Sequence, residues 1–394
     1  MHLRILPLID ETYSHLFFSG KGFWTSLTNY TTTNNHIFYN ILTSFFDIFI
    51  VQEVLAMRFV SLICFWILLG YIFWYLQKNT NFEIAFWAIL LVGLGFSQSV
   101  FSVQGRGYML MSLCSFGAVH QAISLKKDSF FEQKKSQTFF IFWHIAGLFT
   151  SPVFVYTTIG IYGYFFFKAS KKTILSIFIS GILVILGTFL VYLPTFLYNG
   201  FGNFLAAHQD NLQPTSYIKF MTYILPICVR ELIIYLIGFP TYFSFFIFAL
   251  LLFLLFYFYQ KIHTVGKAWL QYIGVSLGIM LVFIIFTKTF PLYRIWTYYG
   301  IFWAIICAFL LVSILPKTNT VGKVLIALGI FAGSFVQFEY AIGEFYDKNT
   351  VQYCEKLRDK FQQMAQKDKK TYLSKDAFYG IFWLRQAGKA HLIV

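Results

Sequence analysis

Apolar residues dominate the chain in long continuous runs, and polar residues gather in the short segments between them. A helix that crosses a hydrocarbon core of about 30 Å needs about 20 apolar residues. The runs that reach or approach this length are 54–76, 83–103, 107–125, 173–198, 236–259, 268–290, 295–315 and 321–338. The pattern therefore predicts an all-α polytopic membrane protein.

One further apolar stretch, 138–168, is interrupted by Thr150-Ser151-Pro152. Because proline ends one helix and is well placed to open the next, we predict two short helices that form a hairpin here. Together with the longer runs, this hairpin gives about ten transmembrane helices.

The composition argues against a soluble protein. Of the 394 residues, 58% are hydrophobic and 12% are charged, against roughly 45–50% and about 25% in soluble domains. The five cysteines are far apart and mostly lie inside apolar runs, so they indicate neither a disulfide framework nor a metal site. The sequence has no Walker loop, Rossmann glycine pattern, HExxH or paired CxxC, which argues against a nucleotide-dependent cytoplasmic active site.

The net charge of +14 is a topology signal. When the loops are assigned alternately to the two sides of the membrane, most loop lysines fall on one side. They are Lys78, Lys126, Lys127, Lys134, Lys135, Lys168, Lys171, Lys172, Lys261, Lys267, Lys317 and Lys323. Short basic loops face the cytoplasm, so the other side faces outward, and a nucleic-acid patch is not indicated. The outward segments are 1–53, 104–106, 199–235, 291–294 and 339–394.

We therefore divide the chain into a first outward loop (1–53), a transmembrane core (54–338) and a small outward tail (339–394). The end of the tail, 370–394, is expected to form a strand and a helix of a small α/β unit. The outward loop 199–235 is aromatic and weakly polar, so it is expected to lie in the membrane interface. Because no helix or signal peptide precedes the first loop, a further helix is expected before the acidic pair.

Two neighbouring carboxylates, Asp10 and Glu11, stand in the first outward loop. A carboxylate at a membrane surface beside buried helices is a candidate general base. The alternative is a solvated turn or a helix cap.

Basic residues lie at the outward ends of several spans: Arg58, Arg106, Lys288 and Arg294. The planar guanidinium group suits phosphate oxygens, so these residues, with Tyr108, are candidates for binding a phosphate. The alternative for each arginine is an interaction with lipid headgroups.

Histidines and neighbouring polar residues form weaker candidates for shaping the site or binding an acceptor. They are Asn35, His36 and Tyr39 in the first loop, Gln104 in a short turn, His144 in the hairpin, and His208 with Asp210 in the loop 199–235. A lone histidine among aromatic residues is more often a hydrogen-bonded core residue than a ligand. No cluster indicates a metal ion, and dependence on a divalent metal stays open.

The order of these motifs resembles the GT-C glycosyltransferases, in the branch of protein O-mannosyltransferases and lipid A aminoarabinose transferases. Bacterial members of the related lipopolysaccharide-core type look most similar. The motifs are Asp10-Glu11, Asn34-Asn35-His36-x-Phe38-Tyr39, Arg58-Phe59-Val60-Ser61, Gln104-Gly105-Arg106-Gly107-Tyr108 and a hairpin that carries His144.

The resemblance implies that Asp10, with Glu11 beside it, is the general base that acts on the acceptor. It implies that Asn35, His36 and Tyr39 shape the same loop, and that Arg106 and Tyr108 hold the lipid phosphate. Gln104 stands where the family often has a glutamate. Arg294 is a weaker match to a basic residue that opens a late helix in the family.

The function expected on this basis is transfer of a hexose or pentose from a polyprenyl-phosphate sugar to a lipid, glycan or protein acceptor, by an inverting single displacement. The membrane would be the bacterial inner membrane, with the active site facing the periplasm. The alternative is a polytopic transporter or a lipid or glycan flippase without transferase activity. The sequence leaves the sugar, the acceptor and the oligomeric state open.

Overall fold

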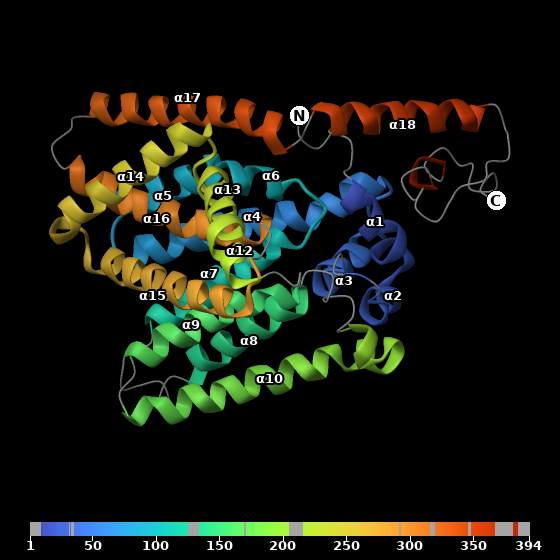
Figure 1. Ribbon diagram of the computed structural model, residues 1–394, viewed down its shortest axis with the longest axis horizontal. Helices are drawn as coiled ribbons and strands as arrows, with labels where there is room; N and C mark the ends of the chain where they lie inside the picture. Colours follow the sequence, from blue (N-terminus) through green and yellow to red (C-terminus); the bar gives the residue numbers. More distant parts are fainter. Residues whose placement is uncertain are drawn as a thin grey trace.

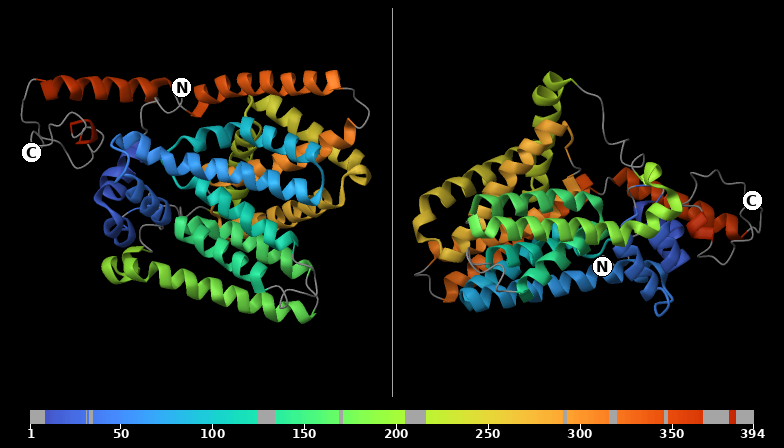
Figure 2. Two further views of the ribbon diagram at one scale, coloured as in Figure 1. Left: turned by 180° about the vertical axis from the view of Figure 1, so that it is seen from behind. Right: turned by 90° about the horizontal axis from the view of Figure 1, so that it is seen from below.

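The computed structural model describes residues 9–30, 32, 35–124, 134–168, 171–204, 216–290, 293–315, 320–345, 348–366 and 381–384 (Figure 1). Within these residues every regular element is a helix, which confirms the all-α fold. Most of the long helices run lengthwise through the molecule, and the short helices near the N-terminus gather at one end (Figures 1 and 2).

The centre of the bundle is formed by α4 (Glu53–Asn79), α5 (Phe82–Leu94), α7 (Tyr108–Ser124) and α16 (Thr297–Ile314). Their facing side chains are apolar and buried, as at Leu68, Val92 and Ile305. The Phe116 ring stacks on Trp269 with the ring centroids 5.6 Å apart. Because lipid tails are as apolar as these side chains, close packing rather than expulsion from water holds such helices together.

The surrounding helices are α8 (Lys134–Thr150), α9 (Val155–Lys168), α10 (Lys171–Asn199), α14 (Thr241–Phe258), α15 (Thr264–Thr287) and α17 (Thr320–Phe345). α17 lies along one edge (Figure 1), and none of its residues 320–337 is buried inside the protein. Its exposed side chains, among them Leu328 and Phe331, suit contact with lipid.

Seven helices in the described residues are long and apolar enough to cross a membrane, or up to eight if one bent pair counts as a span. The expected number of about ten transmembrane helices is therefore not confirmed. α7 and α8 have 17 residues each and α9 has 14, so these helices are shorter than the about 20 residues that a crossing needs.

The run 83–103 was expected to be one helix, but it is bent by 65° between α5 and α6 (Phe96–Ser102). Gly95 has an extended backbone at this point and ends α5. The bend is held from the neighbouring helix, since the buried Gln98 amide donates to the Thr297 carbonyl at 2.9 Å. The bend directs the following turn, 103–107, across the end of the bundle.

The expected break in 138–168 is confirmed. α8 ends at Thr150, and Pro152 opens the short helix η3 (Pro152–Phe154), which leads into α9. Gly147 lets the Phe154 ring approach α8, because a Cβ at that position would lie 2.5 Å from the ring.

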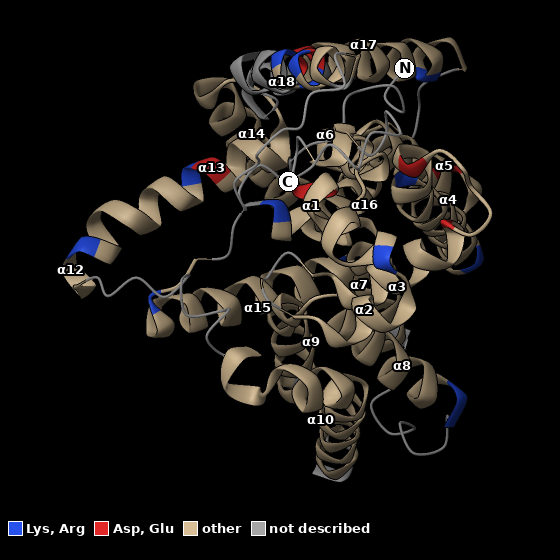
Figure 3. Cartoon of the chain, turned by 90° about the vertical axis from the view of Figure 1, so that its right-hand side faces the viewer, with Lys and Arg blue, Asp and Glu red and all other residues tan. Residues whose placement is uncertain are grey.

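One apolar helix runs crosswise to the others. It comprises α12 (Tyr217–Lys219), the π-helical turn η4 (Phe220–Ile224) and α13 (Leu225–Ile237), and it is seen lengthwise where α10 is seen end-on (Figure 3). It carries the exposed ion pair of Arg230 and Glu231, with an N–O distance of 2.7 Å. By length and hydropathy, 217–237 is one of the seven candidate spans, whereas 199–235 was expected to be an outward loop in the membrane interface; that expectation stays a prediction. The run 236–259 instead begins its helix at Thr241, after Gly238 ends α13 with a φ of 77°.

The short helices α1 (Ile9–Phe17), η2 (Ser19–Lys21), α2 (Phe23–Thr28) and α3 (Ile37–Phe46) lie together at what we call the α1 end (Figure 1). The last residues of α9 and α16 and the first residues of α10 and α17 lie at the opposite end (Figure 1). The remaining helices are η5 (Tyr259–Lys261), η6 (Tyr293–Trp296) and α18 (Lys348–Gln366), with one helical turn at 381–384. The strand expected in the tail is not found in the part described, and 367–380 and 385–394 lie outside it.

The contact of α7 with α8 depends on Gly117, whose Cβ, if present, would overlap the Trp143 ring. We predict that Gly117→Leu forces these helices apart and lowers the midpoint of thermal unfolding in detergent by several degrees, because overpacking costs about 1–3 kcal/mol. Gly70→Leu on α4 is the matched control, since nothing lies within 4 Å of its Cβ position. Equal midpoints for the two variants would contradict the predicted contact.

Candidate active site

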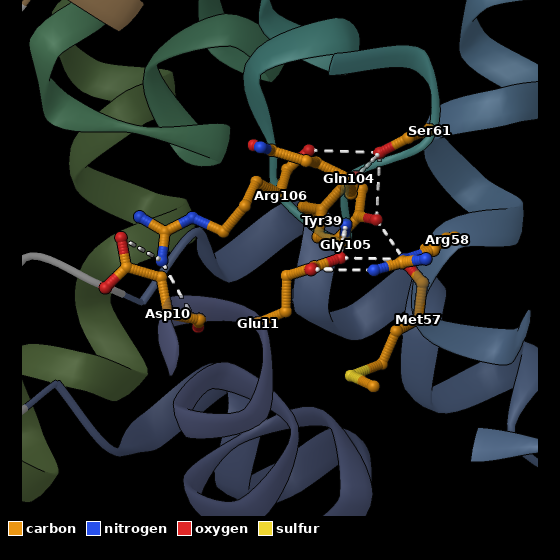
Figure 4. A network of polar contacts seen from close by, with 9 residues as sticks. All are labelled: Asp10, Glu11, Tyr39, Met57, Arg58, Ser61, Gln104, Gly105 and Arg106. Carbon is orange, nitrogen blue, oxygen red and sulfur yellow. Dashed lines mark hydrogen bonds and ion pairs between the residues drawn. The ribbon is translucent and has the colours of Figure 1, made fainter. Parts of the chain in front are cut away.

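The acidic pair lies on α1, and its two side chains point in different directions (Figure 4). Successive residues of a helix are about 100° apart around its axis, so neighbours on α1 face different surroundings. The Glu11 side chain is 1% exposed and that of Asp10 is 36% exposed. The pair therefore supplies one buried and one accessible carboxylate.

Glu11 forms a bidentate ion pair with Arg58 of α4. The Arg58 Nε and Nη2 atoms donate to the two Glu11 carboxylate oxygens, each at 3.0 Å. The backbone N–H of Gly105 also donates to Glu11 Oε1, at 2.6 Å. Buried charges are stable only when they are paired and hydrogen-bonded in this way. The carboxylate therefore joins α1, α4 and the turn 103–107.

The turn 103–107 is also held from α4 by Ser61. The Ser61 hydroxyl lies 2.6 Å from the Gln104 carbonyl and 3.1 Å from that of Arg106. Tyr39 of α3 lies 3.0 Å from the same hydroxyl and donates to the Met57 carbonyl. These contacts fix the backbone from which the Arg106 side chain extends.

Both glycines of this turn permit close packing within the protein. A Cβ at Gly105 would lie 3.1 Å from Met57, and one at Gly107 would lie 2.8 Å from Thr150 and 3.0 Å from His36. The close approach that glycine allows here is to protein atoms on α4, α8 and the residue before α3.

Asp10 lies between two arginines. Arg294 Nη1 donates to Asp10 Oδ2 at 2.9 Å, and Arg106 Nη1 lies 3.7 Å from the same oxygen. Arg106 Nη1 also donates to the Asp10 carbonyl at 3.3 Å. Both guanidinium groups lie over the Tyr108 ring, at 5.7 Å for Arg106 and 5.9 Å for Arg294. The arrangement brings one accessible carboxylate and two cations together on an aromatic surface.

His36 forms part of the wall behind these cations. Its ring lies edge-on to Tyr108, with the centroids 5.2 Å apart. Burial and the nearby charges of Arg106 and Arg294 hold the pKa of His36 well below its usual range. The ring is therefore neutral, and the positive charge of the site is carried by the two arginines.

The backbone of Arg294 is held by Thr297 of α16, which the crosswise helix also contacts. The Arg294 carbonyl accepts a hydrogen bond from the Thr297 hydroxyl at 2.6 Å. That hydroxyl lies 2.6 Å from the Tyr235 hydroxyl of α13. Thr297 is also the residue whose carbonyl receives the Gln98 amide, so α6, α13 and α16 together place η6.

The other predicted residues lie outside this group of contacts. The Asn35 amide bonds to the Ser26 and Asn29 carbonyls and holds α2 against α3. His144 is fully buried in α8, with Nδ1 2.8 Å from the Phe140 carbonyl. The Lys288 ammonium lies 4.9 Å from the centre of the Tyr217 ring. His208 and Asp210 lie outside the described residues.

Three positioning residues were missed by the sequence interpretation, namely Gln98, Tyr235 and Thr297, and Ser61 was quoted only as part of a motif, without a role. Each is a buried polar side chain or hydroxyl within a largely apolar segment. Polar groups in such segments need partners and mark sites of interaction, and this signal was available in the sequence. Among the described residues, no group of three histidine, cysteine or acidic side chains is arranged to hold a metal ion.

The class that these features define is a polytopic all-α membrane protein with a polar site at one end of its bundle. No protein-family model matches the sequence, and no curated protein does. Solved structures that match include ArnT from Cupriavidus metallidurans in the apo state and ArnT bound to undecaprenyl phosphate. Both have a TM-score of 0.63 and 14% identity, and the apo match covers 98% of this chain and 81% of ArnT. The chain therefore has the fold of ArnT, which agrees with the fold expected from the order of the sequence motifs.

The buried pair of Glu11 and Arg58 makes a stability prediction. Arg58→Met leaves the Glu11 carboxylate buried without its cation, which typically costs about 3–5 kcal/mol. The matched control is Arg230→Met, because the Arg230–Glu231 pair is exposed and such pairs contribute about 0–1 kcal/mol. The free energy of unfolding is measured by titration with SDS in mixed micelles. Equal losses for the two variants would show that the buried pair does not stabilise this end.

Proposed function

We propose that the protein is a membrane glycosyltransferase that moves a sugar from a polyprenyl-phosphate donor to a hydroxyl-bearing acceptor. The observation that carries the proposal is the partly exposed Asp10 carboxylate, which is held by Arg106 and Arg294. The guanidinium groups of both arginines lie over the Tyr108 ring. The shared fold with ArnT, which has been solved with undecaprenyl phosphate bound, supports a donor of that lipid class.

The two arginines would bind the donor phosphate. A guanidinium group offers two parallel N–H donors to phosphate oxygens, and both groups already lie near one anion, the Asp10 carboxylate. Tyr108 limits their movement from one side. Arg106 has a 4% exposed side chain and is the more rigidly placed cation, whereas Arg294 is 32% exposed and stands nearer to solvent.

Asp10 would act as the general base. Its carboxylate takes the proton from the acceptor hydroxyl, and the hydroxyl oxygen attacks the anomeric carbon of the sugar. The bond from that carbon to the phosphate oxygen breaks, and the lipid phosphate leaves with both bonding electrons. Positive groups placed where this charge develops lower the barrier. A single displacement inverts the configuration at the anomeric carbon, and Asp10 then releases its proton to water.

Glu11 and Arg58 would position this machinery rather than react. The Glu11 side chain is 1% exposed and that of Arg58 is 3% exposed, and they are bound to each other. We therefore assign the base to Asp10 alone and the phosphate contacts to Arg106, Arg294 and Tyr108. His208 and Asp210, in the segment 199–235, stay candidates for binding the acceptor, and Lys288 stays a candidate for binding the donor phosphate.

The α1 end would face the periplasm of a bacterial inner membrane. α9 and α16 end at the other end of the bundle, and in the sequence both are followed by short segments with lysines; such loops stay in the cytoplasm. The region 54–338 would then be the transmembrane core, with 1–53 and 339–394 outside it.

The first functional prediction concerns Asp10. In purified full-length protein, Asp10→Asn is expected to slow transfer by about 10²–10⁴-fold, the usual contribution of a general base. The measurement is release of undecaprenyl phosphate, by mass spectrometry, from a panel of undecaprenyl-phosphate sugars with envelope lipids as acceptors. Asp359→Asn is the matched control, because this carboxylate is 56% exposed and forms an ion pair with its neighbour Arg358 on α18.

Arg294→Ala is expected to lower turnover by about 10²–10³-fold, because it removes a cation from the leaving phosphate.

Unchanged release in a folded Asp10→Asn protein would remove Asp10 as the base. Absence of release by the parent protein over the whole panel, with lipid movement detected in vesicles, would favour a flippase instead.

The orientation makes a separate prediction. In a Cys354→Ser background, a cysteine at Trp24, which is 71% exposed in α2, should react with a membrane-impermeant maleimide in intact spheroplasts. A cysteine at Lys261 in η5 should react only after the membrane is permeabilised. The reverse pattern would place the α1 end in the cytoplasm.

A further inference from the structure

A short C-terminal segment, 381–384, lies between α18 and α1 and forms one helical turn (Figure 1). It is separated by hundreds of residues from the helix that carries Asp10. Its four residues alternate between partly buried and fully buried, and the side chains of Phe382 and Leu384 are both 0% exposed.

Phe382 packs on both elements that hold the acidic pair. Its ring forms an apolar cluster with Leu16 of α1 and Met57 of α4, and Phe17 and Val54 pack against it. The Phe382 ring also lies edge-on to His15, with the centroids 6.4 Å apart. Met57 is the residue against which Gly105 packs, so Phe382 contacts the same support that holds the turn 103–107.

Leu384 faces the other way. It forms a cluster with Phe361 of α18, to which Leu357 and Met364 contribute. Trp383 belongs to both clusters. The segment is therefore anchored on α18 by one residue and on α1 and α4 by another.

α1 needs such support because it has only nine residues. Isolated helices of this length are marginal in water, so the position of α1 depends on what packs against it. The Glu11–Arg58 pair fixes one point of α1, and Leu16, more than one turn further on, is fixed by Phe382. Two separated contacts define the direction of a helix, whereas one contact leaves it free to tilt.

We propose that 381–384 is a positioning element for catalysis, in which Phe382 holds α1 at the angle that places Asp10 against Arg106 and Arg294. This inference depends on the proposed function for its kinetic effect but not for its structural effect. Phe382 would act through its packing on α1 and α4, not through contact with the reacting groups. A small misplacement of a reacting group can cost about 10²-fold in rate.

The test compares Phe382→Ala with the parent in full-length purified protein. We expect kcat for transfer to fall about 10-fold or more, with KM for the donor changed less than about threefold, because Arg106 and Arg294 keep their contacts with Tyr108. Phe382→Leu keeps most of the apolar contact and should restore kcat to within about threefold of the parent. Should the alanine variant not be recovered as folded protein, Phe382→Val takes its place and should fall between leucine and alanine.

Hydrogen–deuterium exchange provides a readout that does not need activity. Peptides of α1 should exchange faster in Phe382→Ala than in the parent, while peptides of the distant α9 should not. Unchanged exchange in α1 overturns the proposal even where the parent has no transferase activity. Phe331→Ala removes a ring of the same size from the exposed side of α17 and should leave kcat within about twofold; a loss equal to that of Phe382→Ala would also overturn the proposal.

Discussion

The polar end of this bundle depends on the ion pair of Glu11 and Arg58. Moving two charges out of water carries a desolvation cost of several kcal/mol for each ion, and such a cost is offset only by good geometry and additional hydrogen bonds. Both conditions are met, by the two parallel N–H donors of Arg58 and by the Gly105 N–H. The pair thereby joins a short helix, a long transmembrane helix and a turn that are distant in sequence.

The geometry of the pair also determines what its neighbour can do. Because adjacent residues point about 100° apart around a helix, burial of Glu11 turns Asp10 away from α4 and toward η6. The turn that Glu11 holds carries Arg106, which reaches back to Asp10. One buried carboxylate therefore sets both the direction of the accessible carboxylate and the position of one of its two cations, and a change at Glu11 or Arg58 is felt at Asp10.

The sequence predicted the general plan because the bilayer imposes it. Apolar runs of about 20 residues identify spans, and Pro152 marked the break between α8 and α9. The bend at Gly95 was missed, since the apolar run 83–103 continues through it and the partner that holds it, Thr297, lies about 200 residues away in sequence. The crosswise direction of α13 was equally hidden, because length and hydropathy say nothing about tilt.

The candidate site shows the same division between local and distant information. Motif order brought Asp10, Arg106, Tyr108 and Arg294 into one hypothesis, and the structure places these side chains together. The chemistry of the side chains alone could not separate the roles of Asp10 and Glu11, or of Arg58 and Arg106, because the members of each pair carry the same charged group and differ in burial and partners. That difference arises from three-dimensional packing at the α1 end. This packing includes the cluster of Phe382 with Leu16 and Met57, which no local sequence pattern predicts. The distribution of exposed and buried charge, rather than the presence of charge, is therefore what assigns chemistry to this end of the molecule.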